Sequence, residues 1–238
     1  MRTSSEIKAY FTEHGADLCG IASVDRFADA PSGFHPRDVL PGAQSVIVVA
    51  RRFPAGTLRC GSTVPYTLAR NLLSDWLDQL TLQFCCDLEK TGAVAVPTDA
   101  VGPTERDPAD GRMRNILSAK HAAQAAGLGV IGRNTLLITP QFGNMVWLSA
   151  ILCELPLAPD PLLANRYCEG CSLCVDVCPV QALGEPAMRQ AVCLDYAFGG
   201  ENGGEWKIRC YRCRDVCPYC LGEVNRGMMR PSVQAAAD

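Results

Sequence analysis

The sequence predicts a mixed α/β domain followed by a smaller module organised around cysteines. Apolar residues recur alternately at helical and at strand spacing over residues 1–160. Short, regular cysteine spacings are confined to the last third of the chain. The 238 residues, 48% of them hydrophobic, suffice for one substantial core and a small appended module. We therefore expect domains over residues 1–160 and 161–238.

The expected elements of the first domain alternate in type along the chain. Residues 45–50 predict a buried strand because they are β-branched and almost continuously apolar. The long helical repeat over residues 66–90 is expected to end before Gly92, because glycine commonly terminates helices. The other expected elements are a helix over 6–14, strands over 19–24, 93–97 and 145–155, a loop over 98–112, a helix over 115–126 and an extended segment over 134–139.

Charge and hydropathy argue against two classes of partner. The net charge is −3 and no block of lysines or arginines occurs, so the basic surface typical of nucleic-acid binding is not predicted. Residues 1–13 are polar and no run approaches the ~18 apolar residues of a membrane span. We expect a cytoplasmic protein, without a membrane or nucleic-acid partner, in which thiols stay reduced.

Two cysteine runs dominate the second module. The first reads Cys-x2-Cys-x2-Cys-x3-Cys-Pro from Cys168 to Pro179, and the second comprises Cys210, Cys213 and Cys217 before Pro218. This spacing is typical of two-cluster ferredoxins, in which three cysteines hold one 4Fe-4S cluster and the fourth ligates the other. Two clusters need eight thiolates, and Cys193 is the only further cysteine between the runs.

Exchange of the fourth ligands defines two predicted sets. The first cluster is expected to take Cys168, Cys171, Cys174 and Cys217, and the second Cys178, Cys193, Cys210 and Cys213. Structural zinc also uses Cys-x2-Cys pairs but does not explain two Cys-x3-Cys-Pro endings. Disulfide frameworks belong to short secreted chains. Cys220 is either a bystander or a spare ligand, and the cysteines before residue 160 are expected to be buried small hydrophobes.

Three glycines lie close together between an expected helix and an expected strand. Gly127, Gly129 and Gly132 let the backbone approach either a ligand or a neighbouring element, so both a binding loop and a tight structural turn are open interpretations. The order helix, glycines, strand is the reverse of the dinucleotide fingerprint. The P-loop pattern does not occur, so nothing in this sequence supports nucleotide-driven chemistry.

The stretch His-Ala-Ala-x-x-Ala-Gly-Leu-Gly-x-Ile-Gly-Arg-Asn-x-Leu-Leu-Ile-Thr, from His121 to Thr139, precedes the two cysteine runs and the isolated Cys193. With Pro-Arg-Asp-x-Leu-Pro-Gly-Ala-x-Ser-Val-Ile from Pro36, it resembles the epoxyqueuosine reductase and reductive dehalogenase family over nearly the whole chain. The resemblance implies a nitroreductase-like domain, a mixed sheet with flanking helices, which binds base-off cobalamin beside two 4Fe-4S clusters. It also implies a corrin pocket lined by Gly127, Gly129, Gly132, Arg133, Asn134 and Thr139.

The sequence also departs from that family. The acidic motif Asp-x-x-Pro-x-x-Glu-Arg has its nearest counterpart between Asp99 and Arg106, with the proline one place late, which makes Asp99 a candidate proton donor. The helical-repeat extension that helps to recognise tRNA is missing, so tRNA modification is not predicted. A twin-arginine signal, usual in dehalogenases, is missing too.

These observations predict an iron-sulfur oxidoreductase. Single electrons would pass from a low-potential donor, such as a ferredoxin or flavodoxin, through two clusters to a cobalamin-type cofactor that reduces a small molecule. A flavin could replace cobalamin, since it also accepts electrons singly and delivers them in pairs. The alternatives are an electron carrier that docks on a partner enzyme and a protein that reduces or delivers corrinoids. His121 is either a helix-surface residue or a proton donor.

Overall fold

The computed structural model describes residues 2–102, 105–106, 113–184, 187–198 and 206–223. The chain forms two compact units. Unit 1 comprises Met1–Arg52, Leu72–Val130 and Trp147–Ala164, and unit 2 comprises Phe53–Asn71, Ile131–Val146 and Asn165–Asp238. Two segments from the first 160 residues thus join the cysteine-rich part in unit 2. The domain boundary expected after residue 160 stays a prediction.

Unit 1 is built on a four-stranded sheet in the order β1-β2-β8-β3. Strand β1 (Leu18–Ser23) pairs antiparallel with β2 (Ser45–Arg52), and β3 (Ala95–Pro97) pairs antiparallel with β8 (Val146–Cys153). All four strands were expected, with ends shifted by one to two residues. Apolar residues are nearly continuous in β2 and β8 because both faces of these inner strands are covered.

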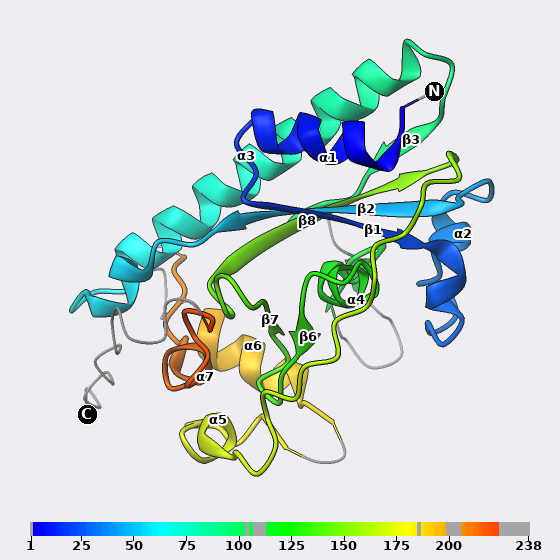
Figure 1. The fold of residues 1–238 in the computed structure, drawn as a ribbon. Coiled ribbons are helices and arrows are strands. Elements are labelled where there is room, and N and C mark those ends of the chain that lie inside the picture. Colours follow the sequence, from blue (N-terminus) through cyan, green and yellow to red (C-terminus); the bar gives the residue numbers. More distant parts are fainter. Residues whose placement is uncertain (1, 103–104, 107–112, 185–186, 199–205, 224–238) are drawn as a thin grey trace. The chain divides into compact units, whose positions relative to one another are not determined.

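Helices α1 (Ser4–Glu13) and α3 (Val64–Glu89) lie over one face of this sheet (Figure 1). Thr3 and Glu6 form a capping box that starts α1. The α1 residue Phe11 meets Phe84 of α3 with ring centroids 4.7 Å apart, and both side chains are 0% exposed. Each buried side chain of this size contributes roughly 1.5–3 kcal/mol relative to exposure. Helix α3 ends before Gly92, which has φ +82°, as expected.

Helix α4 (Ala119–Ala125) packs against strands β1 and β2 on the other face. Ala122 and Ala123 are 0% exposed, and a Cβ on Gly20 of β1 would lie 2.6 Å from the Ala126 carbonyl oxygen. Small residues on both elements therefore allow this close approach. The helix begins four residues later than predicted, after Asn115 has turned to donate a hydrogen bond to Asp99. It ends at Gly127, which has φ +72°.

Short elements complete the two units. They are the 3-10 helices η1 (Val24–Phe27) and η2 (Ala55–Arg59), helix α2 (Pro36–Val39), and the ribbons β4 (Glu105–Arg106) with β5 (Met113–Arg114) and β6 (Val130–Ile131) with β7 (Leu137–Ile138). The loop expected over 98–112 includes β4, and residues 103–104 and 107–112 lie outside the described part. Extension over 134–139 was predicted too broadly, because Thr135 has φ +59° and the backbone turns there.

The described cysteine-rich part of unit 2 forms the short helices α5 (Leu173–Asp176), α6 (Gln190–Phe198) and α7 (Arg212–Asp215). An aromatic stack joins Phe53, Tyr66 and Tyr211, with ring centroids 4.6 and 4.4 Å apart. Helices of one turn are unstable alone, so α5 and α7 depend on the contacts around them. Among the described helices, none combines the length and apolarity needed to cross a membrane.

Candidate iron-sulfur site

Four cysteines line a cavity within unit 2. Cys168 and Cys171 come from the loop before α5, Cys174 from α5 itself, and Cys217 follows α7. The other lining residues are Arg133, Asn134, Tyr167, Leu173, Pro218 and Tyr219. The structure therefore brings together the four thiols that the crossed arrangement requires for the first cluster. Their iron ligation stays a prediction.

The pKa values of these thiols reflect their mutual proximity. Burial raises the pKa of Cys217 to about 11, and the neighbouring Cys168, Cys174 and Cys171 act in the same direction. Burial also raises the pKa of Cys174, again reinforced by Cys168 and Cys171. Such clustered thiols resist ionisation without a cation, whereas bound iron favours the thiolates strongly. The donor set thus fits an iron-sulfur cluster.

The other four cysteines form a second group. Burial raises the pKa of Cys193, and Cys210 and Cys178 raise it further. For Cys213, burial raises the pKa to about 12, with Cys210, Cys193 and also Cys174 adding to it. These effects show that Cys193 lies near Cys178, Cys210 and Cys213, and their ligation of one cluster stays a prediction.

No three described His, Cys, Asp or Glu side chains are close enough to share a single metal ion. This does not conflict with the two thiol groups, because the four cysteines of a cubane each bind a different iron.

Backbone amides point at two of the sulfurs. The N–H of Ala182 donates to Cys178 Sγ at 3.2 Å, and the N–H of Arg133 donates to Cys168 Sγ at 3.4 Å. Arg189 holds the turn after Cys178 by donating to the carbonyl oxygens of Val180 and Gln181. Hydrogen bonds to cluster sulfurs raise the reduction potential, so these amides both shape and tune the site.

The glycine-rich segment contributes to this site from its second half. A Cβ on Gly132 would lie 3.4 Å from Cys168 Sγ. Asn134 is 4% exposed, and its Nδ2 donates to the Cys213 carbonyl oxygen at 3.1 Å. Thr139 is 0% exposed, and its Oγ1 accepts from the N–H of Phe142. These residues, predicted to line a corrin pocket, have structural contacts in unit 2.

The first half of the segment belongs to unit 1. There the backbone of Pro161 fills the space beside Gly127, so the missing side chain allows protein packing. Gly129 lies between α4 and β6, and the Arg133 side chain is exposed. Packing against protein atoms thus accounts for Gly127 and Gly132. The assignment of the six residues to cobalamin stays a prediction.

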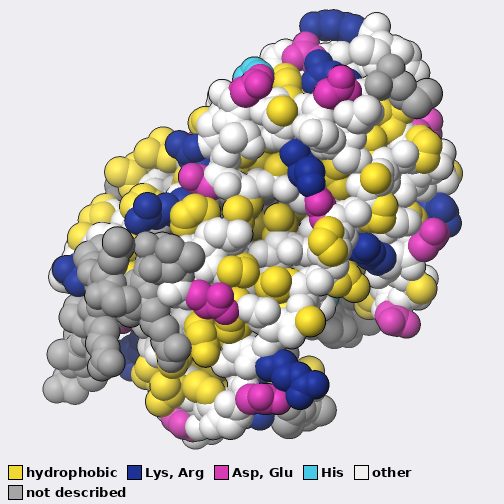
Figure 2. All heavy atoms as spheres, in the orientation of Figure 1, with side chains coloured by type: hydrophobic (Ala, Val, Ile, Leu, Met, Phe, Trp, Pro, Cys, Tyr) yellow, Lys and Arg dark blue, Asp and Glu magenta, His cyan; other side chains and the backbone are white. Residues whose placement is uncertain are grey.

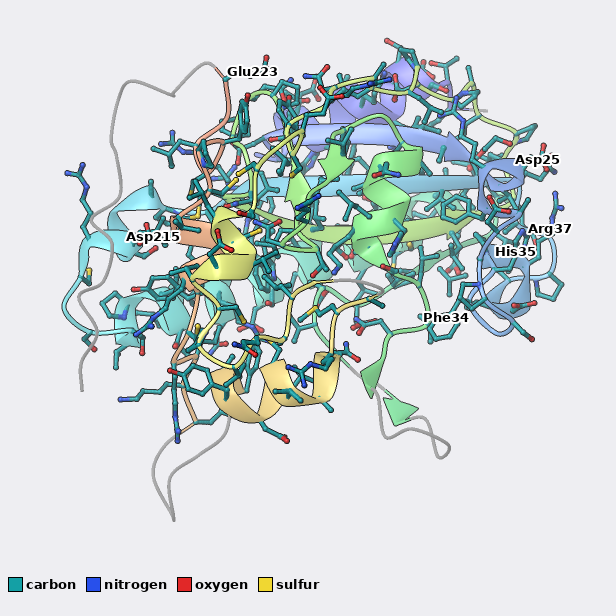
Figure 3. All side chains as sticks on the ribbon, turned by 90° about the horizontal axis from the view of Figure 1, so that it is seen from below. Asp25, Phe34, His35, Arg37, Asp215 and Glu223 are labelled. Carbon is teal, nitrogen blue, oxygen red and sulfur yellow. The ribbon has the colours of Figure 1, made fainter. Side chains whose placement is uncertain are left out.

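Buried polar residues next to the thiols escaped the sequence analysis. Arg214 and Asp215 are each 6% exposed, and Asn144, 1% exposed, donates from Nδ2 to the Arg214 carbonyl oxygen at 3.2 Å. Burial raises the pKa of Asp215 to about 6, and its Oδ1 has no hydrogen-bond partner among the described residues. Figure 3 labels Asp215 on this segment. Three charged residues inside a Cys-x2-Cys-x3-Cys-Pro run, Arg212, Arg214 and Asp215, were the available signal.

Asp99 lies in unit 1 as a candidate acid. It is 9% exposed, and Asn115 Nδ2 donates to its Oδ2 at 2.5 Å. Burial raises the pKa of Asp99, and the Asp78 carboxylate raises it further. His121 Nδ1 lies 2.7 Å from Ser118 Oγ, and burial with the nearby Lys120 charge lowers its pKa. These shifts favour the neutral form of both side chains, and the catalytic role of Asp99 stays a prediction.

The sequence of this chain matches a known iron-sulfur domain and known reductases. Residues 165–184, which hold the first cysteine run, match the family model for a 4Fe-4S binding domain. Epoxyqueuosine reductase from Gloeobacter violaceus is 32% identical over 226 residues, 85% of this chain and 64% of that protein. The enzyme from Leadbetterella byssophila is 27% identical over 256 residues, 91% and 79% of the two chains. The chain is similar in sequence to the epoxyqueuosine reductases. The resemblance stated from the sequence is confirmed.

Several solved structures have the same fold as this chain. The reductase from Streptococcus thermophilus has a TM-score of 0.64 at 20% identity, covering 92% of this chain and 66% of its own. A reductive dehalogenase has a TM-score of 0.69 at 18% identity, covering 97% and 34%. These likenesses confirm the predicted α/β fold class. The chain spans 35% of the Listeria monocytogenes reductase, at 37% identity over 133 residues, and 64% of the Gloeobacter protein.

Proposed function

We propose that this chain is an iron-sulfur oxidoreductase that holds two 4Fe-4S clusters and passes single electrons from a low-potential donor protein, a ferredoxin or flavodoxin, to a bound acceptor. The observation that supports the proposal most directly is the cavity lined by Cys168, Cys171, Cys174 and Cys217, which joins a cysteine of the second run to three of the first. The 4Fe-4S domain match over residues 165–184 supports it independently.

The residues around the thiols would position the sulfurs for cluster binding. A bound cluster supplies a one-electron carrier whose potential depends on hydrogen bonds, charge and exposure. The amides of Ala182 and Arg133 orient two sulfurs, and Asn134 ties the glycine-rich segment to the backbone of Cys213. Because burial holds the thiols protonated, cluster insertion releases protons and is favoured by rising pH.

The acceptor in this proposal is a base-off cobalamin that reduces a small substrate. A solved reductive dehalogenase with this fold is described as suggesting a mechanism for B12-dependent dehalogenation, which supports a corrinoid over a flavin. Gly127 and Gly132 pack against protein atoms, so the corrinoid assignment depends on the relatives.

Asp99 is the proposed proton donor to the reduced substrate. Its burial and its raised pKa favour a protonated carboxyl, and the hydrogen bond from Asn115 holds the side chain in place. A solved structure of the Bacillus subtilis epoxyqueuosine reductase is described as having an aspartate catalytic loop swung out of its active site. An acid that donates protons from a loop beside the sheet fits both observations.

Anaerobic reconstitution with iron and sulfide tests the proposal. We expect about eight irons per chain and two cluster signals by electron paramagnetic resonance after dithionite reduction. Titration with cob(II)alamin should then give a base-off signal at about one equivalent. Two reducible clusters without corrinoid or flavin binding would leave the electron-carrier alternative, and fewer than two clusters would contradict the proposal.

One control in this experiment concerns nucleic acid. A related epoxyqueuosine reductase has been solved with a tRNA-Tyr stem loop. The net charge of −3 predicts no such partner here, and acidic and basic side chains are interspersed on the face shown in Figure 2. We expect a tRNA stem loop to leave the cluster signals and the cobalamin titration unchanged.

A further inference from the structure

Asp99, the proposed acid, lies where the chain leaves strand β3. The sheet hydrogen bonds continue one residue past β3, because the Thr98 N–H donates to the Ala150 carbonyl oxygen at 2.8 Å. Ser149 Oγ donates in turn to the Thr98 carbonyl oxygen at 3.0 Å. Thr98 is 3% exposed, so these bonds are protected from water. The sheet therefore holds the chain up to the residue before Asp99.

After Asp99 the chain is held by helix α3. Asp78 Oδ1 accepts a hydrogen bond from the Ala100 N–H at 2.8 Å, between residues 22 positions apart in the sequence. That nitrogen belongs to the peptide bond that joins Asp99 to Ala100, so the Asp78 carboxylate lies directly against the backbone of Asp99. Hydrogen bonds to a carboxylate are stronger than bonds between neutral groups, and this one is partly buried. Asp78 therefore ties the chain after Asp99 to α3.

Helix α3 is itself held against the sheet one turn before Asp78. Trp147, on β8, donates from its indole Nε1 to Ser74 Oγ at 2.9 Å, and Ser74 is 6% exposed. Residues four apart lie on the same face of a helix. Ser74 and Asp78 thus bond from one face of α3 to β8 and to the chain that leaves β3. The helix turn that carries Asp78 is therefore fixed within unit 1.

The Asp78 carboxylate also acts on Asp99 by its charge. Burial raises the pKa of Asp99, and Asp78 raises it further, because a nearby like charge disfavours ionisation. Burial also raises the pKa of Asp78, the Ala100 N–H lowers it and Asp75 raises it. Among the described residues, the charged groups that act on this pair are thus carboxylates of α3. The contacts from β8 and from Asn115 are neutral.

We propose that Asp78 is a positioning residue for the proposed acid: it anchors the backbone after Asp99 to α3 and places a fixed negative charge beside that residue. The inference rests on the proposed function, in which Asp99 donates a proton to the reduced substrate. With the chain held both before and after Asp99, the acid keeps one place beside the sheet. The charge favours the form of Asp99 that carries the proton, which is the form a proton donor needs.

Two measurements on the reconstituted full-length chain test the anchor and the charge separately. Amide hydrogen exchange of Ala100, followed by NMR, reports the anchor, and a carboxyl 13C titration, with D99N to assign the signal, gives the pKa of Asp99. D78A should speed the exchange about tenfold, which is the order expected for one hydrogen bond to a charged group, and should lower that pKa. D78N keeps an acceptor oxygen without the charge, so it should retain most of the protection and still lower the pKa.

The matched control is D75N, one turn earlier on α3, where the side chain is exposed. It should leave exchange at Ala100 unchanged and lower the pKa of Asp99 less than D78N does, because solvent screens its charge. Unchanged exchange in D78A, or equal pKa changes in D75N and D78N, would overturn the role of Asp78. If D78A does not fold, an unchanged pKa of Asp99 in D78N would overturn it alone. A wild-type chain without clusters or corrinoid would contradict the proposed function, while both measurements would still decide whether Asp78 positions Asp99.

Discussion

Cysteines that burial affects to the same extent have different neighbours in the two units. Burial raises the pKa of Cys19 and of Cys85 in unit 1 to about 12, the same value as for Cys213 in unit 2. Cys85 belongs to the hydrophobic core with Phe84 and Leu88. Cys213 instead lies in a group of four thiols held by turns and backbone amides. Burial therefore does not identify a ligand, whereas grouping does.

The two units also differ in what can stabilise them. Unit 1 has a four-stranded sheet covered by helices on both faces, so buried apolar area accounts for its fold. In unit 2, α5 and α7 are single turns that carry or flank the cysteines. Much of the stability of that part must come from whatever binds the thiols, because metal-binding free energy is also folding free energy.

The largest effect should follow removal of iron. Chelation of the reconstituted protein should abolish hydrogen-exchange protection over the cysteine-bearing residues 168–178 and 206–217, while β1 and β2 remain protected. Mass spectrometry after anaerobic exchange measures both regions in one sample. Equal loss of protection in β2 would show that unit 1 does not hold its fold independently of the clusters.

Single cysteine substitutions should separate the two groups. Cys217→Ala and Cys168→Ala should each damage the same cluster spectrum and lower iron by up to about four atoms per chain, whereas Cys193→Ala and Cys213→Ala should damage the other. Iron analysis with electron paramagnetic resonance distinguishes the pairs. Cys85→Ala is the control and should keep all iron. A Cys217→Ala spectrum that matches Cys213→Ala would refute the crossed assignment.

A core substitution should act on unit 1 alone. Phe84→Ala removes a ring that is 0% exposed and should lower the free energy of unfolding by about 3–5 kcal/mol. Leu82→Ala, on the same helix but 54% exposed, should change it by less than about 0.5 kcal/mol. Urea unfolding followed by circular dichroism measures both. Cluster spectra altered by Phe84→Ala in folded protein would mean that the two units are coupled more closely than their cores indicate.

The smallest effect should come from Asp99→Asn. Because burial raises the folded-state pKa of Asp99 above 3.8, ionisation opposes folding, and its stability contribution is lost as pH rises through the folded-state pKa. The Asn variant should therefore be at least as stable as wild type at pH 7, with the difference shrinking toward pH 4. Urea midpoints across that range test the sign. A variant less stable at pH 7 than at pH 4, relative to wild type, would contradict it.

Local sequence patterns were sufficient to predict most helices and strands of unit 1. The strands were predictable because β-branched runs such as residues 45–50 form buried strands in almost any context. Helix α3 was predictable because its apolar repeat and Gly92 indicate the same end of the helix. The start of α4 was not predictable, because Asn115 is drawn to Asp99 by a contact 16 residues away. The same limit applies to Thr135, whose positive φ no propensity indicates.

The sequence by itself determined the ligand types, their two spacings and the need for an eighth thiol, because cluster loops are local and their chemistry demands cysteine. Only the tertiary structure decided that residues 131–146 belong with the cysteines, that Asn134 reaches the Cys213 backbone and that Arg214 is buried. Those facts depend on contacts between segments far apart in the chain, and the burial of a residue is set by such contacts.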